Sequence, residues 1–176
     1  LSVNFPFGAG LVAAGTGVVL NDEMDDFVSL PGAKNVYGLV GGLANAIAPG
    51  KRMLSSMTPT FLENDKRVAV LGTPGGSRII SMVLLGALDF ADGNGPDSWV
   101  RVPRFHHQFI PDMIEYEKEA LTTDEISRLS ARGHQLKEAR YRYGNMQAVM
   151  RDKTAGTLTA ASDPRGAGRA SVYSWN

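Results

Sequence analysis

The order of strand-like and helical segments along this chain of 176 residues predicts an α+β fold, with a layer of helices against a largely antiparallel sheet. Two observations lead to this prediction. Strand-like runs precede a central group of two or three helical segments, and further strand-like runs follow that group. Short turn-forming segments join the strands in pairs, as is typical of antiparallel hairpins. The length suits one hydrophobic core, so we expect residues 1–176 to form a single domain.

The first half of the chain supplies short strands and one strongly apolar helix. Glycines punctuate the first fifty residues and leave room there only for short strands, such as residues 18–20. The β-rich runs 58–62 and 68–71 flank a polar segment, which predicts a hairpin. The run over residues 79–90 is apolar on nearly every side and predicts a buried helix.

Short helices and short strands alternate in the second half. We expect a helix over 96–102, a strand over 114–117, a helix over 122–131, and paired strands over 146–150 and 157–161. Thr122 and Glu125 have the spacing of a capping box, which fixes the start of the third helix, and Gly133 ends it.

Composition argues against several classes of function. Lys plus Arg number 18 and Asp plus Glu number 18, so no general attraction to nucleic acid is expected. The absence of cysteine removes thiol nucleophiles, disulfides and thiolate metal sites. No apolar run approaches the roughly 20 residues that span a bilayer. His106 and His107 are adjacent on an extended segment and have no third ligand nearby, so we expect hydrogen-bonding histidines rather than a metal site.

Gly75 and Gly76 stand between the expected strand 68–71 and the apolar helix. Their backbone N–H groups are unshielded by side chains and lie near a helix N-terminus, where orphan donors and the helix dipole favour negative charge. Such a pair suits a carboxylate, a phosphate or the oxyanion of acyl transfer. The alternative is a tight turn that lets the helix pack close to the sheet.

Three further segments carry polar groups suited to a small ligand. Residues 22–26 hold four carboxylates, which form either a solvated acidic turn or a pocket for an ammonium group. Ser55 and Ser56 either donate to a carboxylate or cap a turn. The loop over residues 31–42, with Tyr37 near its middle, is either a functional lid or a plain connector.

Several long motifs, in order along the chain, resemble the small subunit of the γ-glutamyltranspeptidases. They cover residues 21–27, 31–42, 49–60, 72–80, 103–108 and 161–165. The resemblance implies an N-terminal nucleophile hydrolase fold, an αββα sandwich of two antiparallel sheets between helix layers. It also implies a precursor that cuts itself into a large and a small subunit, which stay together as a heterodimer. This chain is then the small-subunit portion.

The activity that the resemblance implies is γ-glutamyl acyl transfer. An N-terminal Thr takes the γ-glutamyl group from glutathione or a related donor, and water or the amine of an amino acid or dipeptide removes it. No cofactor, metal or nucleic acid is implied, and the location is periplasmic or secreted. The rival functions are a cephalosporin or glutaryl acylase of the same superfamily and a non-catalytic γ-glutamyl-binding relative. Asp26 argues against the acylase, because a glutaryl group has no ammonium.

The positions that match donor-binding residues of the family are Asn4, Glu23, Asp26, Tyr37, Ser55 and Ser56. Ser55 and Ser56 resemble the hydroxyls that hold the donor's α-carboxylate. Asp26, assisted by Glu23 and Asn4, resembles the anchor of its α-ammonium. Glu23 stands where some relatives carry Gln.

The remaining family roles concern the reaction itself and its lid. Gly75 and Gly76 resemble the oxyanion hole, and Tyr37 resembles an aromatic gate in the lid loop that can meet Asn4. Ser2 matches a supporting hydroxyl and not the nucleophile. The Thr-Thr-His run that begins the family's small subunit is absent, because the chain begins one strand later. We therefore expect the catalytic Thr upstream of this sequence or on another chain; the alternative is a relative without the activity.

Overall fold

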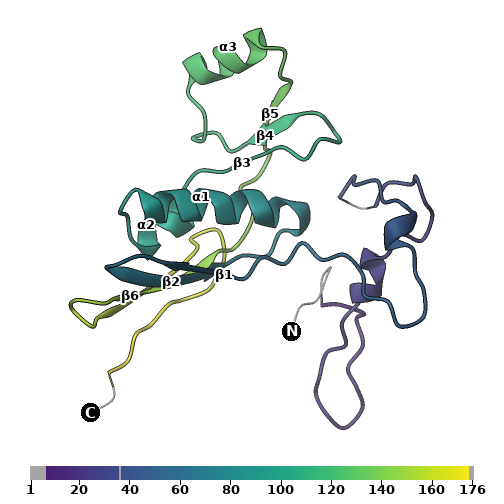
Figure 1. The fold of residues 1–176 in the computed structure, drawn as a ribbon, viewed down its shortest axis with the longest axis horizontal. Coiled ribbons are helices and arrows are strands. Elements are labelled where there is room, and N and C mark those ends of the chain that lie inside the picture. Colours follow the sequence, from purple (N-terminus) through teal and green to yellow (C-terminus); the bar gives the residue numbers. More distant parts are fainter. Residues whose placement is uncertain (1–6, 36, 175–176) are drawn as a thin grey trace. The chain divides into compact units, whose positions relative to one another are not determined.

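The computed structural model describes residues 7–35 and 37–174 (Figure 1). The chain divides into two compact units, Leu1–Ser55 and Ser56–Asn176. The first unit contains two short 3-10 helices, η1 (Glu23–Asp26) and η2 (Leu43–Asn45), joined by turns and isolated bridges. The expectation of one domain over residues 1–176 stays a prediction, because a division by compactness does not test whether the units fold independently.

The second unit is built on a four-stranded antiparallel sheet in the order β1-β2-β6-β7. Its strands are β1 (Thr60–Glu63), β2 (Arg67–Gly72), β6 (Gln147–Asp152) and β7 (Leu158–Ser162). Both hairpins are those predicted from the sequence, and the long-range pairing of β2 with β6 joins them, with Val70 opposite Val149. The predicted antiparallel sheet of an α+β fold is confirmed.

One face of this sheet packs against α1 (Ile79–Ala91) and α2 (Pro96–Arg101) (Figure 1). Ala69 and Leu71 alternate inward from β2, because successive side chains of a strand point to opposite faces. Phe90 of α1 meets Trp99 of α2 edge-to-face, with ring centroids 5.6 Å apart. The buried core consists of Ala69, Leu71, Ile79, Met82, Val83, Phe90, Trp99, Val100, Met146, Ala148 and Ala161.

A second, three-stranded sheet has the order β3-β4-β5. It consists of β3 (Phe105–His106), β4 (Ile114–Tyr116) and β5 (Leu136–Glu138), with β4 and β5 parallel. Helix α3 (Thr123–Ala131) makes the crossover between the parallel strands. Its predicted capping box is present, since Thr122 Oγ1 accepts from the Glu125 N–H at 3.2 Å and Glu125 Oε2 accepts from the Thr122 N–H at 2.8 Å.

The strand expected over residues 18–20 is wrong. Val19 forms only an isolated bridge with Val12, around a turn in which Gly15 and Gly17 have positive φ. Three backbone hydrogen bonds join the two arms of this loop, and no further strand pairs with it among the described residues. A lone two-stranded ladder buries too little surface to extend further.

Four charged side chains form a buried network at the junction of the two sheets. Arg104, Glu117 and Asp163 are each no more than 2% exposed. Arg104 pairs with Asp163, and Arg165 pairs with Asp163 at 3.1 Å and donates from Nε to Glu117 at 2.8 Å. Asp163 also accepts from the Met146 N–H at 2.9 Å. The network thereby joins residues flanking β3 and β4 to residues flanking β6 and β7.

The Asp163 carboxylate is held in its charged form. Burial raises its pKa, but hydrogen bonds from the backbone N–H groups of Arg165 and Met146 and from the Arg104 guanidinium outweigh burial, so the pKa lies below its ordinary value. A depressed native pKa means that this stabilisation is complete above the unfolded-state pKa, about 4. It is lost as the pH falls through the lower native pKa.

Replacing Asp163 tests this network. We expect Asp163→Asn in the full-length protein to lower the free energy of opening of β6 and β7 by about 3–5 kcal/mol at pH 7, because two arginines lose their buried partner. The difference from wild type should begin to shrink as the pH falls below about 4, because Asp163 takes up a proton in the opened state before it does so in the native state. Hydrogen exchange of peptides from both strands measures the opening. An equal opening free energy in both proteins at pH 7 would contradict the assignment.

Candidate functional site

The glycine pair lies where the chain leaves β2 and enters its longest helical run. Gly75 and Gly76 have φ of +149° and +58°, which L side chains rarely adopt. Gly76 begins the 3-10 helix η3 (Gly76–Arg78), which continues directly into α1. The Gly75 carbonyl accepts from the Arg78 N–H at 3.2 Å and closes the first turn. The pair therefore occupies the positive end of the run.

Gly75 is also confined by space. A Cβ added there would lie 2.6 Å from Cε of Met82, one of the most deeply buried side chains of α1. This contact agrees with the tight-turn alternative, in which glycine lets the helix pack closely. Among the residues that the structure describes, however, no acceptor is found for the N–H groups of Gly75 and Gly76. The pair thus combines close packing with two unpaired donors at a helix N-terminus, an arrangement that suits an anion.

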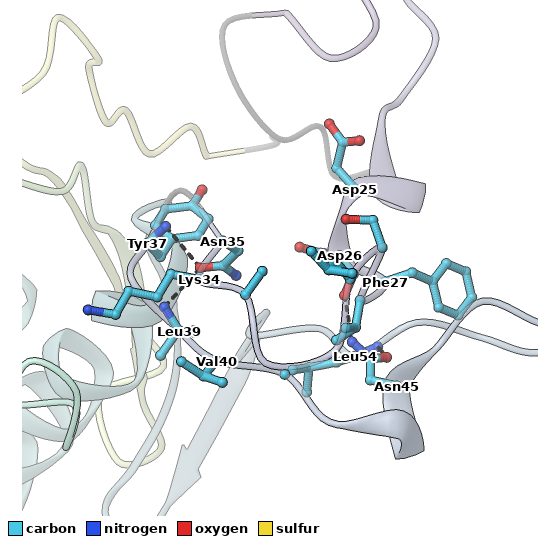
Figure 2. Close-up of a pocket in the computed structure, with 15 residues that line it drawn as sticks. Asp25, Asp26, Phe27, Lys34, Asn35, Tyr37, Leu39, Val40, Asn45 and Leu54 are labelled. Atoms are coloured by element: carbon cyan, nitrogen blue, oxygen red, sulfur yellow. Dashed lines mark hydrogen bonds between the residues drawn. The ribbon is translucent and has the colours of Figure 1, made fainter.

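A pocket of about 310 Å³ lies within the first unit (Figure 2). Its lining includes Asp26 at the end of η1 and Tyr37 in the loop over residues 31–42, two of the predicted site residues. Its other lining residues are Asp25, Phe27, Val28, Ser29, Leu30, Ala33, Lys34, Asn35, Leu39, Val40, Gly41, Asn45 and Leu54. The structure thus brings the predicted acidic anchor and the predicted gate to one cavity.

The pKa of the Tyr37 hydroxyl is raised by burial and by nearby carboxylates. Burial raises its pKa above the ordinary value, and the carboxylates of Asp26, Asp22 and Glu23 raise it further. The Asn35 side chain shapes the loop by accepting from the Tyr37 and Leu39 N–H groups, each at 3.0 Å. The carboxylate of Asp26 therefore lies close enough to Tyr37 to act on its hydroxyl, in a pocket whose lining also includes the cation Lys34.

Asn45 was not singled out from the sequence, yet it organises the pocket wall (Figure 2). Its Nδ2 donates to the Asp26 carbonyl at 2.7 Å, and its Oδ1 accepts from the Leu54 N–H at 2.9 Å. Its own carbonyl accepts from the Val28 N–H at 2.9 Å. One amide side chain thus connects the backbone of the acidic anchor to the residue before Ser55.

The other predicted residues are placed as follows. Glu23 lies in η1 with Asp26, and its Oε1 is buried with no hydrogen-bond partner among the described residues. Ser55 ends the first unit and Ser56 begins the second. Thr58 Oγ1 donates to the Ser56 carbonyl at 2.9 Å. Ser2 and Asn4 lie outside the described residues.

The two histidines make hydrogen bonds, as expected. His106 lies between Ser81 and Gln108, and His107 pairs with Asp112 at 2.8 Å. Within residues 7–35 and 37–174, no group of three or more His, Asp or Glu side chains is arranged to hold a metal ion. The same residues include no helix with the length and apolarity needed to cross a membrane.

Comparison with known proteins gives consistent matches. The profile of the Gamma-glutamyltranspeptidase family matches residues 1–173. The chain is 46% identical over 168 residues to the glutathione hydrolase proenzyme of Escherichia coli, covering 93% of this chain and 28% of that protein. It is 44% identical over 171 residues to the Pseudomonas aeruginosa glutathione hydrolase proenzyme, covering 95% and 30%. The chain therefore spans less than a third of these curated relatives.

Solved structures agree in fold. A Helicobacter pylori gamma-glutamyltranspeptidase (T380A mutant) superimposes with a TM-score of 0.85 at 39% identity, covering 94% of this chain and 91% of that chain. The Bacillus anthracis transpeptidase CapD gives 0.67 at 25% identity, covering 97% and 87%. The predicted αββα fold of an N-terminal nucleophile hydrolase is confirmed by these likenesses.

Alanine substitutions at three glycines separate strain from crowding. We expect Gly75→Ala to destabilise the second unit most, because it adds both a strained φ and a clash with Met82. Gly93→Ala, at φ +96° in open space, should cost only the strain, about 1–3 kcal/mol. Gly72→Ala has neither penalty. Hydrogen exchange of α1 and β2 in the full-length protein gives the ranking, and equal effects at Gly75 and Gly93 would refute the crowding argument.

Substitution of Asn45 tests the pocket wall. Asn45→Asp keeps the acceptor for the Leu54 N–H but loses the donor to the Asp26 carbonyl, whereas Asn45→Ala loses both. We expect faster amide exchange at Leu54 in Asn45→Ala, by about tenfold for one lost hydrogen bond, and a smaller change in Asn45→Asp. Asn35→Ala, which disturbs the loop but not Asn45, is the control. Unchanged Leu54 exchange in Asn45→Ala would contradict the described bridge.

Proposed function

The chain belongs to the γ-glutamyltranspeptidase family, and from this premise we propose that the full-length protein cleaves the γ-glutamyl amide of glutathione and related donors. The reaction is an acyl transfer through a γ-glutamyl-enzyme intermediate. The intermediate is released as glutamate by water or passed to the amine of an amino acid or dipeptide. The observation that carries the proposal is the pair of amides at Gly75 and Gly76, which have no acceptor in the part of the chain that the structure describes, in a chain of this family. Neither the glutaryl acylase nor a non-catalytic binding protein is favoured by the relatives found.

The glycine amides serve as the oxyanion hole in this proposal. A Thr hydroxyl outside this chain, with its own α-amine as base, attacks the γ-carbonyl carbon. The carbonyl π electrons move to oxygen, and the N–H groups of Gly75 and Gly76 donate to the resulting oxyanion. Collapse of the intermediate expels the amine of the donor, which takes up the proton from the base. Each such donor contributes about 3–4 kcal/mol in comparable sites. Ser2 supports the nucleophile by hydrogen bonding.

The donor's amino-acid head is held by charge-assisted hydrogen bonds. Asp26, with Glu23 and Asn4, binds the α-ammonium, and the place of the Asp26 carboxylate in the lining of the pocket supports that assignment. Ser55 and Ser56 bind the α-carboxylate. Holding both groups orients the γ-carbonyl for attack. Tyr37 acts as the gate of the lid loop over residues 31–42, which suits small donors.

A large subunit from the same precursor is the partner that this proposal requires. Phe61, Val70, Val149 and Ala160 form a row across all four strands on the sheet face opposite α1 and α2. Phe61 is 75% exposed and Leu158, on β7, is 48% exposed. An αββα sandwich places a second sheet against such a face, so the large subunit covers this row. Self-cleavage of the precursor and a periplasmic or secreted location complete the proposal, both on the basis of the family.

Kinetics of the processed full-length protein with γ-glutamyl-p-nitroanilide test the assignment. We expect Asp26→Ala mainly to raise KM, by about 30-fold or more, because a charge-assisted contact to the ammonium is lost. Gly76→Ala should mainly lower kcat, by about 100-fold or more, because one oxyanion donor is displaced.

Gly72→Ala serves as the control, and rates are normalised to the amount of processed small subunit. Unchanged kinetics in both site variants would refute the assignment of these residues. Turnover of glutaryl-p-nitroanilide in preference to the γ-glutamyl substrate would replace the proposed activity with that of an acylase.

A further inference from the structure

A chain of hydrogen bonds links Ser77, the residue after the glycine pair, to His106 of β3. We call its four side chains the polar relay: Ser77, Gln108, His106 and Ser81. Ser77 Oγ donates to Gln108 Oε1 at 2.6 Å. The same oxygen lies 2.8 Å from His106 Nε2, and His106 Nδ1 lies 2.7 Å from Ser81 Oγ. His106 is 7% exposed, so this chain of hydrogen bonds runs into the protein interior.

Sequence spacing explains why these side chains meet. Ser77 and Ser81 are four residues apart on one helical run, so they lie on the same side of it. His106 and Gln108 are two residues apart on an extended segment, so they too point to one side. Helix α1 packs against β3, and the two pairs face each other there. Neither pair is evident as a unit from its own local sequence.

The direction of each hydrogen bond follows from the Gln108 amide. Its Nε2 donates to the Ile110 carbonyl at 3.0 Å, so its Oε1 is the atom that faces Ser77 and His106. An oxygen acceptor there requires the His106 proton on Nε2, and Nδ1 then accepts from Ser81.

The neutral form of His106 suits this arrangement. Burial lowers its pKa, against an opposing effect of the hydrogen bond to Gln108. Among its charged neighbours, Arg78 and His107 lower the pKa, and Glu115 raises it. A neutral imidazole with a fixed tautomer keeps every member of the relay in one orientation.

The glycine pair needs such an anchor. Glycine backbones have the greatest conformational freedom, and two of them adjoin here. Amide donors stabilise a developing oxyanion well only when their direction is fixed before the reaction. Ser77 is the first residue after the pair that carries a side chain, so a tether at Ser77 is the nearest one available on the helical side. Arg78, the next residue, pairs with Glu115 and supports the same turn.

We propose that Gln108 and His106 are positioning residues: acting through Ser77, they hold the N–H groups of Gly75 and Gly76 in the direction that stabilises the oxyanion. This inference rests on the proposed function and adds to it two residues that do not touch the donor. Loss of the polar relay should therefore lower turnover and leave donor binding unchanged.

The test compares matched variants of the processed full-length protein with γ-glutamyl-p-nitroanilide. Ser77→Ala, Gln108→Met and His106→Phe each break the relay, Ser77→Thr keeps its hydroxyl, and His107→Phe alters the neighbouring exposed histidine. We expect relay-breaking variants to lose about tenfold in kcat, less than the roughly 100-fold loss of a whole oxyanion donor. Their KM should stay within about threefold of wild type, because donor binding is untouched. Ser77→Thr and His107→Phe should keep wild-type kcat within about twofold.

Amide exchange of a peptide over residues 72–80, measured on the same samples, gives a readout that does not need activity. The inference predicts faster exchange in the relay-breaking variants and wild-type exchange in Ser77→Thr and His107→Phe. Wild-type kcat and exchange in Ser77→Ala and Gln108→Met would overturn it. Failure of the wild-type protein to turn over the γ-glutamyl substrate would instead refute the proposed function. In that case the exchange data alone test the relay, and wild-type exchange in Ser77→Ala and Gln108→Met would overturn it.

Discussion

The way in which the chain passes from β2 into α1 determines the arrangement of the second unit. The chain must turn sharply while α1 stays packed on the sheet, and a Cβ at Gly75 would lie only 2.6 Å from the Met82 Cε, so the buried Met82 side chain would have to shift. Two consecutive positive-φ residues satisfy both demands. Among residues 7–35 and 37–174, the same turn leaves two amides without an acceptor at the N-terminus of a helical run. Close packing and the pair of donor amides are therefore consequences of one backbone feature, so we expect a substitution that disturbs one to disturb the other.

Rigidity around this turn comes from polar contacts between distant segments. Arg78 pairs with Glu115 of β4 and lies over the Tyr143 ring at 4.8 Å. A buried network also joins the segments beside the two sheets. It consists of Arg104, Glu117, Asp163 and Arg165. Buried charges of this kind add little net stability compared with apolar packing, but they are costly to break singly. They fix the relative positions of the segments that they join.

The sequence predicts the parts of the fold that have local patterns. Both hairpins, the apolar helix and the capping box at Thr122 follow from periodicity and turn chemistry. The strands β3 and β5 were not predicted, because two or three residues carry no periodicity and their pairing is decided by tertiary contacts. The prediction of a strand over residues 18–20 was wrong because a β-rich run does not reveal whether enough neighbouring chain pairs with it. Val19 forms only an isolated bridge with Val12.

The candidate site divides in the same way. Gly75, Gly76, Asp26 and Tyr37 were found from glycine spacing, charge clustering and family resemblance. Asn45 and Gln108 were not singled out as site residues, because an isolated side-chain amide has no local sequence signature. The side-chain partners of Asn45 lie 9 and 19 residues away along the chain, and Ser77 lies 31 residues from Gln108.

On the basis of the family, we propose that Asp26 binds the ammonium of a γ-glutamyl group and that the glycine amides bind its carbonyl oxygen. A crystal structure of the processed full-length protein with bound glutamate tests it most directly. The account predicts the ammonium on the Asp26 carboxylate and a γ-carboxylate oxygen about 3 Å from the backbone nitrogens of Gly75 and Gly76. Glutamate bound with its γ-carboxylate away from both amides would contradict it.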